Sequence, residues 1–213
     1  TLTLGAPKIG LLNSASTDYV GRLRVAPKIG LVKLNETSNL QLNEAEDFSN
    51  FPPPRSVNGH KGTFGHVGIV GGSLGYHGAA VLAARAASRS QPGLVTLMTP
   101  EEVFVPVASQ LQSVMVHPLT QKNIEFKLAT ALLIGPGMAA KGLNKDIKEK
   151  TNQIWHASPM PILVDASALD WITTGEITSK SIRVITPHPG EAARLLECTA
   201  ADIQADREKA LQA

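Results

Sequence analysis

Glycine and polar residues gather in turns that directly follow short apolar segments, and these turns are where the chain could bind a ligand. In the clearest case, an apolar segment at 67–70 leads into a turn with glycines at 71, 72, 75 and 78. An alanine-rich helix is predicted to begin near Ala79. A strand, a glycine turn and a helix start direct backbone N–H groups towards one point, which suits a phosphate or pyrophosphate. Glycine matters there because a side chain would hold the ligand away from the amides.

Two common nucleotide motifs are excluded by the residues around these glycines. A P-loop requires a Lys-Ser or Lys-Thr pair after its last glycine, and none follows Gly78. The dinucleotide pattern G-x-G-x-x-G also fits poorly, because the spacing of the glycines differs. Considered alone, a glycine turn that serves only the packing of helix on strand is the alternative interpretation.

Three further apolar segments, at 131–134, 161–164 and 182–185, each run into a glycine-rich or polar turn. Helical patterns at 79–89, 143–156 and 191–196 alternate with the segments. This alternation predicts an α/β protein with a parallel sheet covered by helices. Ligands of such sheets bind beyond the carboxyl ends of the strands, and all four turns are predicted to lie at that edge.

The four segments together resemble a known family. GTFGHVGIVGGSLGYHGAAVLAARAA, LLIGPGMA, ILVDASAL and VITPHPGEAARLL, in this order, are similar to the NAD(P)H-hydrate dehydratases of the ribokinase-like superfamily, from Asn58 to about Leu196. The resemblance implies a ribokinase-like three-layer α/β/α fold with a mainly parallel sheet, incomplete in this chain.

The resemblance also implies a metabolite-repair reaction. NADH and NADPH take up water to form redox-inactive hydrates, and the family uses ADP in bacterial types or ATP in eukaryotic types to phosphorylate the new hydroxyl, with ADP the expected donor here. Phosphate then leaves, NAD(P)H is restored, and AMP and phosphate are released when ADP is the donor. Phosphate is a far better leaving group than hydroxide, and such a site needs positioned phosphates and Mg²⁺ to offset charge.

Carried over residue by residue, the family's substrate-binding positions fall on seven residues of this chain: Gly78, Ala79, Gly135, Gly137, Thr186, His188 and Glu191. Several of them have a structural alternative. The glycines suit tight turns, His188 lies between two prolines, and Glu191 in a first helical turn favours the helix dipole. Asp165 either acts on the phosphates or metal from a second shell or caps a helix near Ser167. No residue is assigned as a direct metal ligand. Ala139 stands where the family's GPGxG turn has its last glycine.

Three regions are predicted along the chain. Residues 1–38 resemble the last strands of a hydrate epimerase domain, 39–57 form a polar, proline-containing linker, and 58–213 are the N-terminal part of the dehydratase domain. The family's catalytic aspartate belongs to a GTGD-type motif that these residues lack. We therefore expect an internal piece of a bifunctional protein, with the catalytic aspartate beyond residue 213. Alone, it is expected not to turn over hydrate, and measurable activity would contradict this.

Composition limits the partners. The chain has 20 basic and 18 acidic residues, and its lysine-rich segment 141–150 is interleaved with acids, which gives no support to nucleic-acid binding. No apolar run approaches the roughly 20 residues of a membrane span. The lone Cys198 and the scattered histidines indicate neither an internal disulfide nor a zinc site, as in a cytoplasmic protein.

A homo-oligomer is expected from the family. Two alternatives remain: a ribokinase-like kinase for a vitamin precursor or sugar, and a non-catalytic nucleotide-binding remnant.

Overall fold

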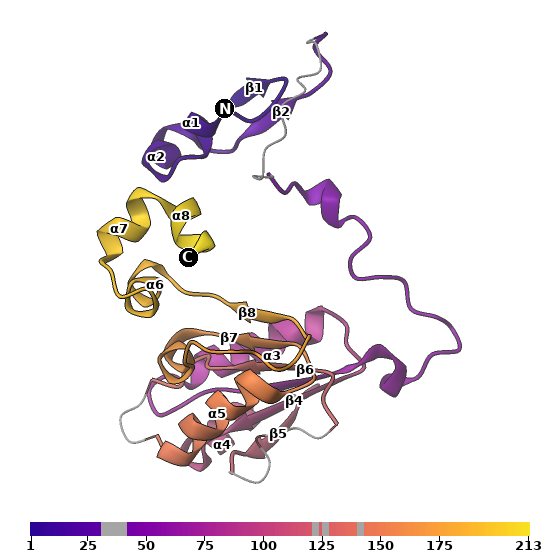
Figure 1. Cartoon of the computed structure of the whole chain (residues 1–213). Coiled ribbons are helices and arrows are strands. Elements are labelled where there is room, and N and C mark those ends of the chain that lie inside the picture. Colours follow the sequence, from indigo (N-terminus) through magenta and orange to yellow (C-terminus); the bar gives the residue numbers. More distant parts are fainter. Residues whose placement is uncertain (31–41, 121–123, 125–127, 140–142) are drawn as a thin grey trace. The chain divides into compact units, whose positions relative to one another are not determined.

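The computed structural model describes residues 1–30, 42–120, 124, 128–139 and 143–213. They divide into two compact units, Thr1–Pro53 and Pro54–Ala213 (Figure 1). In the first unit two short strands pair in parallel, and short helical segments follow each of them. These elements are β1 (Leu2–Leu4), α1 (Ile9–Leu12), η1 (Ser14–Ser16), α2 (Thr17–Val20), β2 (Arg24–Ala26) and η2 (Ala45–Phe48).

The second unit is built on a six-stranded sheet in which every neighbouring pair is parallel and the strand order is β5-β4-β3-β6-β7-β8. The strands are β3 (His66–Val70), β4 (Leu94–Thr99), β5 (Met115–Pro118), β6 (Ala131–Ile134), β7 (Ile162–Val164) and β8 (Arg183–Ile185). Their short, apolar and largely β-branched sequences suit strands that are covered on both faces.

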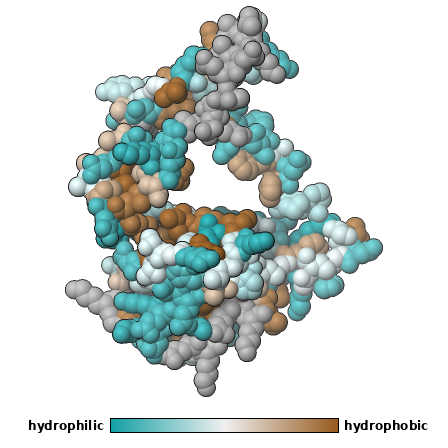
Figure 2. Space-filling model, viewed as in Figure 1, coloured by the Kyte–Doolittle hydropathy of each residue, from teal (hydrophilic) through white to brown (hydrophobic). Residues whose placement is uncertain are grey.

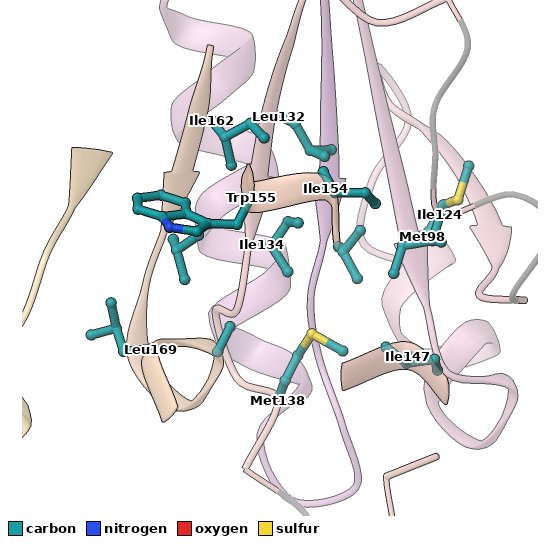
Figure 3. Close-up of a cluster of buried hydrophobic side chains, with 13 residues drawn as sticks. Met98, Ile124, Leu132, Ile134, Met138, Ile147, Ile154, Trp155, Ile162 and Leu169 are labelled. Atoms are coloured by element: carbon teal, nitrogen blue, oxygen red, sulfur yellow. The ribbon is translucent and has the colours of Figure 1, made fainter. Parts of the chain in front are cut away.

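Helices cover the two faces of this sheet, giving three layers (Figure 1). Helices α3 (His77–Arg89) and α4 (Glu101–Ala108) pack on one face, where Ile69, Ala80 and Val107 belong to one buried cluster. On the other face lie α5 (Lys145–Ala157) and the 3-10 helix η4 (Ala166–Trp171). Figure 3 shows the cluster beneath them, in which Trp155 and Met138 pack against Ile134.

The remaining helical elements of this unit are one 3-10 helix before the sheet and three α-helices after it. They are η3 (Lys61–Phe64), α6 (Pro189–Leu195), α7 (Ala200–Ala205) and α8 (Arg207–Gln212). Hydrophobic residues gather over β8 and α6 (Figure 2), where Ile182, Val184 and Ile185 are exposed. Arg183 fixes β8 to the end of α5, because its guanidinium donates to the carbonyls of Trp155 and Ser158, both at 2.6 Å. Burial lowers the pKa of Arg183 from its usual value.

The predicted α/β class is confirmed, and all four segments predicted as strands are strands whose bounds differ by at most one residue. The three predicted helices are also present. Strands β4 and β5 and helix α4 were not predicted. Helix α4 contains Pro106, which is disfavoured inside a helix, and β5 lies at the sheet edge with alternating exposure. None of the helices in the described ranges is both long and apolar enough to cross a bilayer.

Candidate functional site

The four turns singled out in the sequence lie at one edge of the sheet. Strands β3, β6, β7 and β8 run parallel, so the residues that follow them emerge on the same side. Gly137 and His188 each come three residues after the end of their strand. The arrangement expected from the sequence, with these residues and Gly78 at one edge, is therefore the observed one.

The glycine turn after β3 and the turn after β6 are joined by two hydrogen bonds. The backbone N–H of Gly72 donates to the carbonyl of Pro136 at 2.8 Å, and Ser73 Oγ donates to the carbonyl of Gly137 at 2.6 Å. Ser73 is 2% exposed. Sequence reasoning did not single out Ser73, although its place between the glycines was a usable signal, because a small hydroxyl residue can bond backbone within a turn.

Close backbone approach explains two glycines of the second turn. Gly137 has a φ of +71°, and a Cβ there would lie 2.3 Å from the carbonyl oxygen of Tyr76. Gly135 has a φ of +124°, and its Cβ would lie 1.8 Å from the carbonyl oxygen of Asp165. Both positions therefore exclude a side chain, and through them the start of α3, the β6 turn and the end of β7 are in mutual contact. Ala139, which replaces the usual glycine, is exposed.

Helix α3 begins without a side-chain cap. Its N-cap residue, Tyr76, makes no capping hydrogen bond, and the first turn contains no acidic residue. The first N–H groups of a helix have no partner within the helix, so they favour an external acceptor, above all an anion. Gly78 borders open space, because a Cβ added there would meet no atom within 4 Å. The start of α3 is thus accessible to a ligand.

Asp165, directly after β7, is paired with Thr186, directly after β8. Thr186 Oγ1 donates to Asp165 Oδ1 at 2.7 Å. The alternative in which the Asp165 side chain caps the following helix is wrong, because this side chain makes no capping hydrogen bond to η4. Its carboxylate instead turns towards the neighbouring strand, at the edge of the sheet formed by the carboxyl ends of the strands.

His188 and Glu191 form a reciprocal cap at the start of α6. His188 Nδ1 accepts from the backbone N–H of Gly190 at 3.0 Å and of Glu191 at 3.3 Å. Glu191 Oε2 accepts from the backbone N–H of His188 at 2.9 Å, and Oε1 lies 3.2 Å from His188 Nε2. The structural role predicted for Glu191 at this helix start is confirmed. Helix α6, unlike α3, therefore has a side-chain cap on its first N–H groups.

Helix α6 is held beside η4 by an ion pair. Arg194 Nε lies 2.9 Å from Asp170 Oδ1, and a second guanidinium nitrogen lies 3.2 Å from Oδ2. The hydrogen bond to Asp170 and the charge of that carboxylate raise the pKa of Arg194 above its usual value. The pair fixes α6, and with it the ring of His188, relative to the segment that follows β7.

The described residues contain no group of three His, Cys, Asp or Glu placed to hold a metal ion. Mg²⁺ does not require such a group, because it commonly binds through one or two carboxylates, water and the phosphates of a nucleotide. Asp165 places one carboxylate at the edge formed by the carboxyl ends of the strands.

Comparison with known proteins places residues 67–213 within the model of the NAD(P)H-hydrate dehydratase family. The bifunctional NAD(P)H-hydrate repair enzyme of Escherichia coli K12 is 36% identical over 211 residues, which cover 97% of this chain and 40% of that protein. The corresponding enzyme of Moorella thermoacetica is 36% identical over 230 residues, covering 97% and 42%. The chain thus spans about two fifths of the length of these relatives.

Solved structures agree with the fold. The ADP/ATP-dependent NAD(P)H-hydrate dehydratase of Bacillus subtilis, crystallised with ATP and Mg²⁺, matches with a TM-score of 0.66 and 26% identity, over 77% of this chain and 58% of that one. A Streptococcus mutans protein described only as hypothetical matches with a TM-score of 0.64 and 30% identity, over 75% and 59%. A ribokinase-like protein of Enterococcus faecalis matches at 0.57 and 25%, over 74% and 58%. These matches bear out the expected ribokinase-like architecture.

Proposed function

This chain belongs to the NAD(P)H-hydrate dehydratase family, and from that premise we propose that it serves the nucleotide-dependent repair of NAD(P)H hydrate. The hydroxyl that water has added to the nicotinamide ring takes a phosphoryl group from ADP or ATP. Phosphate then leaves with that oxygen, a ring proton is lost, and NAD(P)H is restored. With ADP as donor, the other products are AMP and phosphate.

The observation that carries the proposal is the uncapped start of α3 beside two glycine turns. A dinucleotide contains a pyrophosphate, and the first turn of α3 around Gly78 and Ala79, which has no side-chain cap, suits its oxygens. Because this helix start is in close contact with Gly137, the ligand can also contact the turn that follows β6. We therefore assign substrate binding to the turns that contain these residues and Gly135.

Thr186, His188 and Glu191 complete the proposed substrate edge on the side of β8. Asp165 is proposed to act through Thr186 and towards the phosphates. Mg²⁺, when bound, would offset the charge of the transferred phosphoryl group, with Asp165 as the nearest protein carboxylate. These residues bind and orient the substrate. The aspartate that the family resemblance assigns as proton acceptor is none of them, so the proposal is tested by binding.

The proposal extends to the organisation of the protein. Residues 1–38 are proposed to be part of a hydrate epimerase domain, with 39–57 as linker and 58–213 as dehydratase domain. The 97% coverage of this chain by bifunctional relatives supports this, because the matched part includes the residues before the dehydratase match. We further propose a homo-oligomer in the cytoplasm. Light scattering on the purified chain tests the oligomer.

Gly78→Ala is the sharpest test of the substrate edge. The added methyl group enters open space, and the φ of Gly78 lies outside the left-handed region. Alanine also favours helix more than glycine does, so the substitution does not destabilise the folded state. If the dinucleotide lies against this backbone, the methyl group keeps it away. We expect calorimetry to show binding of NADPH hydrate weakened about tenfold or more, roughly 1.4 kcal/mol.

Gly10→Ala is the matched control, because Gly10 also lies in a helix with nothing within 4 Å of an added Cβ, but in the first unit. It is expected to leave binding unchanged. Equal affinities for the parent chain and Gly78→Ala would overturn the assignment of the α3 start to the substrate.

A further inference from the structure

We propose that His188 meets the substrate as a hydrogen-bond donor, with its proton held on Nε2, and that Gly190 and Glu191 are positioning residues for its ring. That a ligand meets His188 rests on the proposed function. The position of the proton rests on the geometry of the cap alone.

The ring nitrogen Nδ1 is occupied by two donors. The backbone N–H groups of Gly190 and Glu191 point at it from 3.0 and 3.3 Å. A backbone N–H can only donate, so Nδ1 must present its lone pair to them. In the neutral imidazole one nitrogen carries the proton and the other accepts. The cap therefore places the proton of His188 on Nε2.

Glu191 supports the same assignment from the other side of the ring. Its Oε1 lies 3.2 Å from Nε2, close enough for the carboxylate to favour a proton on that nitrogen, while Oε2 accepts from the backbone N–H of His188. The Glu191 side chain is 11% exposed, whereas that of His188 is 64% exposed. The carboxylate is thus mostly buried, whereas the ring itself remains open to a ligand.

Gly190 provides the space in which the imidazole lies. A Cβ built at this position would be 3.0 Å from Cε1 and 3.3 Å from Nδ1 of His188, closer than an ordinary contact. The φ of Gly190 lies outside the left-handed region, so the backbone itself would tolerate alanine. The expected consequence of a side chain here is displacement of the ring.

The same arrangement recurs at His60, whose Nδ1 accepts from the backbone N–H of Gly62 at 3.1 Å. A Cβ at Gly62 would lie 3.0 Å from Cε1 of His60. His60 precedes β3, so it belongs to the opposite edge of the sheet, and the residue three positions later is Thr63 instead of a glutamate. The chain therefore contains a histidine cap of equal local geometry away from the proposed substrate edge.

This assignment restricts the substrate atom that faces His188. A fixed Nε2–H selects an acceptor, so the ring is matched to an oxygen such as the carboxamide carbonyl or the hydroxyl oxygen of a hydrated nicotinamide. It also means that His188 is not the group that removes a proton from the substrate hydroxyl. Its role is to orient the ring that reacts.

The first test reads the proton directly and needs no ligand. Long-range ¹H–¹⁵N correlation spectra of the 213-residue chain at neutral pH distinguish the two neutral tautomers of each histidine. We expect an unprotonated Nδ1 and a protonated Nε2 at both His188 and His60. A protonated Nδ1 at His188, or rapid averaging of its two nitrogens, would overturn the proposal.

The second test measures binding of NADPH hydrate to variants. His188→Asn keeps a side-chain oxygen that can cap α6, but removes the donor at the position of Nε2. Gly190→Ala keeps the donor and displaces the ring, and Gly62→Ala is its matched control at His60. We expect the two changes at α6 to weaken binding about tenfold or more, and Gly62→Ala to leave it unchanged.

The outcomes separate this proposal from the proposed function. Unchanged binding in both Gly78→Ala and His188→Asn would overturn the substrate edge itself. Weakened binding in Gly78→Ala with unchanged binding in His188→Asn and Gly190→Ala would overturn only the role of His188. Denaturation midpoints of all variants identify any loss that comes from unfolding, and His188→Asn remains informative if Gly190→Ala fails to fold.

Discussion

Replacing Gly137 with alanine tests how the turns after β3 and β6 are held together. At a φ of +71° an L-residue is disfavoured by about 1 kcal/mol relative to glycine. The new Cβ would also lie 2.3 Å from the carbonyl oxygen of Tyr76 and 3.0 Å from the Cβ of Ala79, so the start of α3 must move. Overpacking of this kind costs about 1–3 kcal/mol. We expect a total loss of stability of about 3 kcal/mol.

Gly75→Ala isolates the backbone contribution. Its φ is +85°, close to that of Gly137, but a Cβ there meets nothing within 4 Å. The expected loss is about 1 kcal/mol.

Chemical denaturation followed by tryptophan fluorescence measures the stability of both variants. The midpoint temperature of thermal unfolding should fall by about 9 °C for Gly137→Ala and by about 3 °C for Gly75→Ala. At temperatures where both remain folded, Gly137→Ala should also bind NADPH hydrate more weakly, because the α3 start has shifted. Equal losses of stability in the two variants would refute the reasoning, since the clash with Tyr76 would then contribute nothing.

Two further predictions concern hydroxyl and carboxyl groups. Thr99 Oγ1 is fully buried and has no hydrogen-bond partner among the described residues, so Thr99→Val should raise the free energy of unfolding by about 1 kcal/mol. Thr151→Val should lower it by a similar amount, because Thr151 Oγ1, equally buried, donates to the Ile147 carbonyl at 2.8 Å. If urea titration shows a lower free energy of unfolding for both variants, the interpretation of Thr99 Oγ1 as an unsatisfied buried group is contradicted. Hydrogen bonds from Thr199 lower the pKa of Asp202 below its reference value of 3.8. The contribution of the Asp202 carboxylate to the α7 cap is therefore present above that value and is lost as the pH falls below it, so amide exchange in α7 should accelerate in acid. Asp202→Asn should abolish that pH dependence, and an unchanged acid response in this variant would assign it to another group.

The sequence determined the local elements and their order. Apolar β-branched segments followed by glycine or polar residues predicted four strands of the sheet, because a strand buried on both faces and the turn that ends it have distinct compositions. The alternation with helices predicted a parallel sheet, and with it the common edge of the turns. The motif at 186–191 also indicated that Glu191 would stabilise a helix start, since that effect acts within one turn.

Only the tertiary structure decided how those turns meet. The bond from Ser73 to Gly137 joins residues 64 positions apart, and the bond from Thr186 to Asp165 joins residues 21 positions apart. Such pairs follow from the strand order, in which β3 lies between β4 and β6, and no local pattern encodes that order. The direction of the His188 ring likewise required coordinates. The sequence shows that residue 188 is a histidine. Which of its ring nitrogens accepts from the backbone amides depends on the rotamer that the surrounding packing permits.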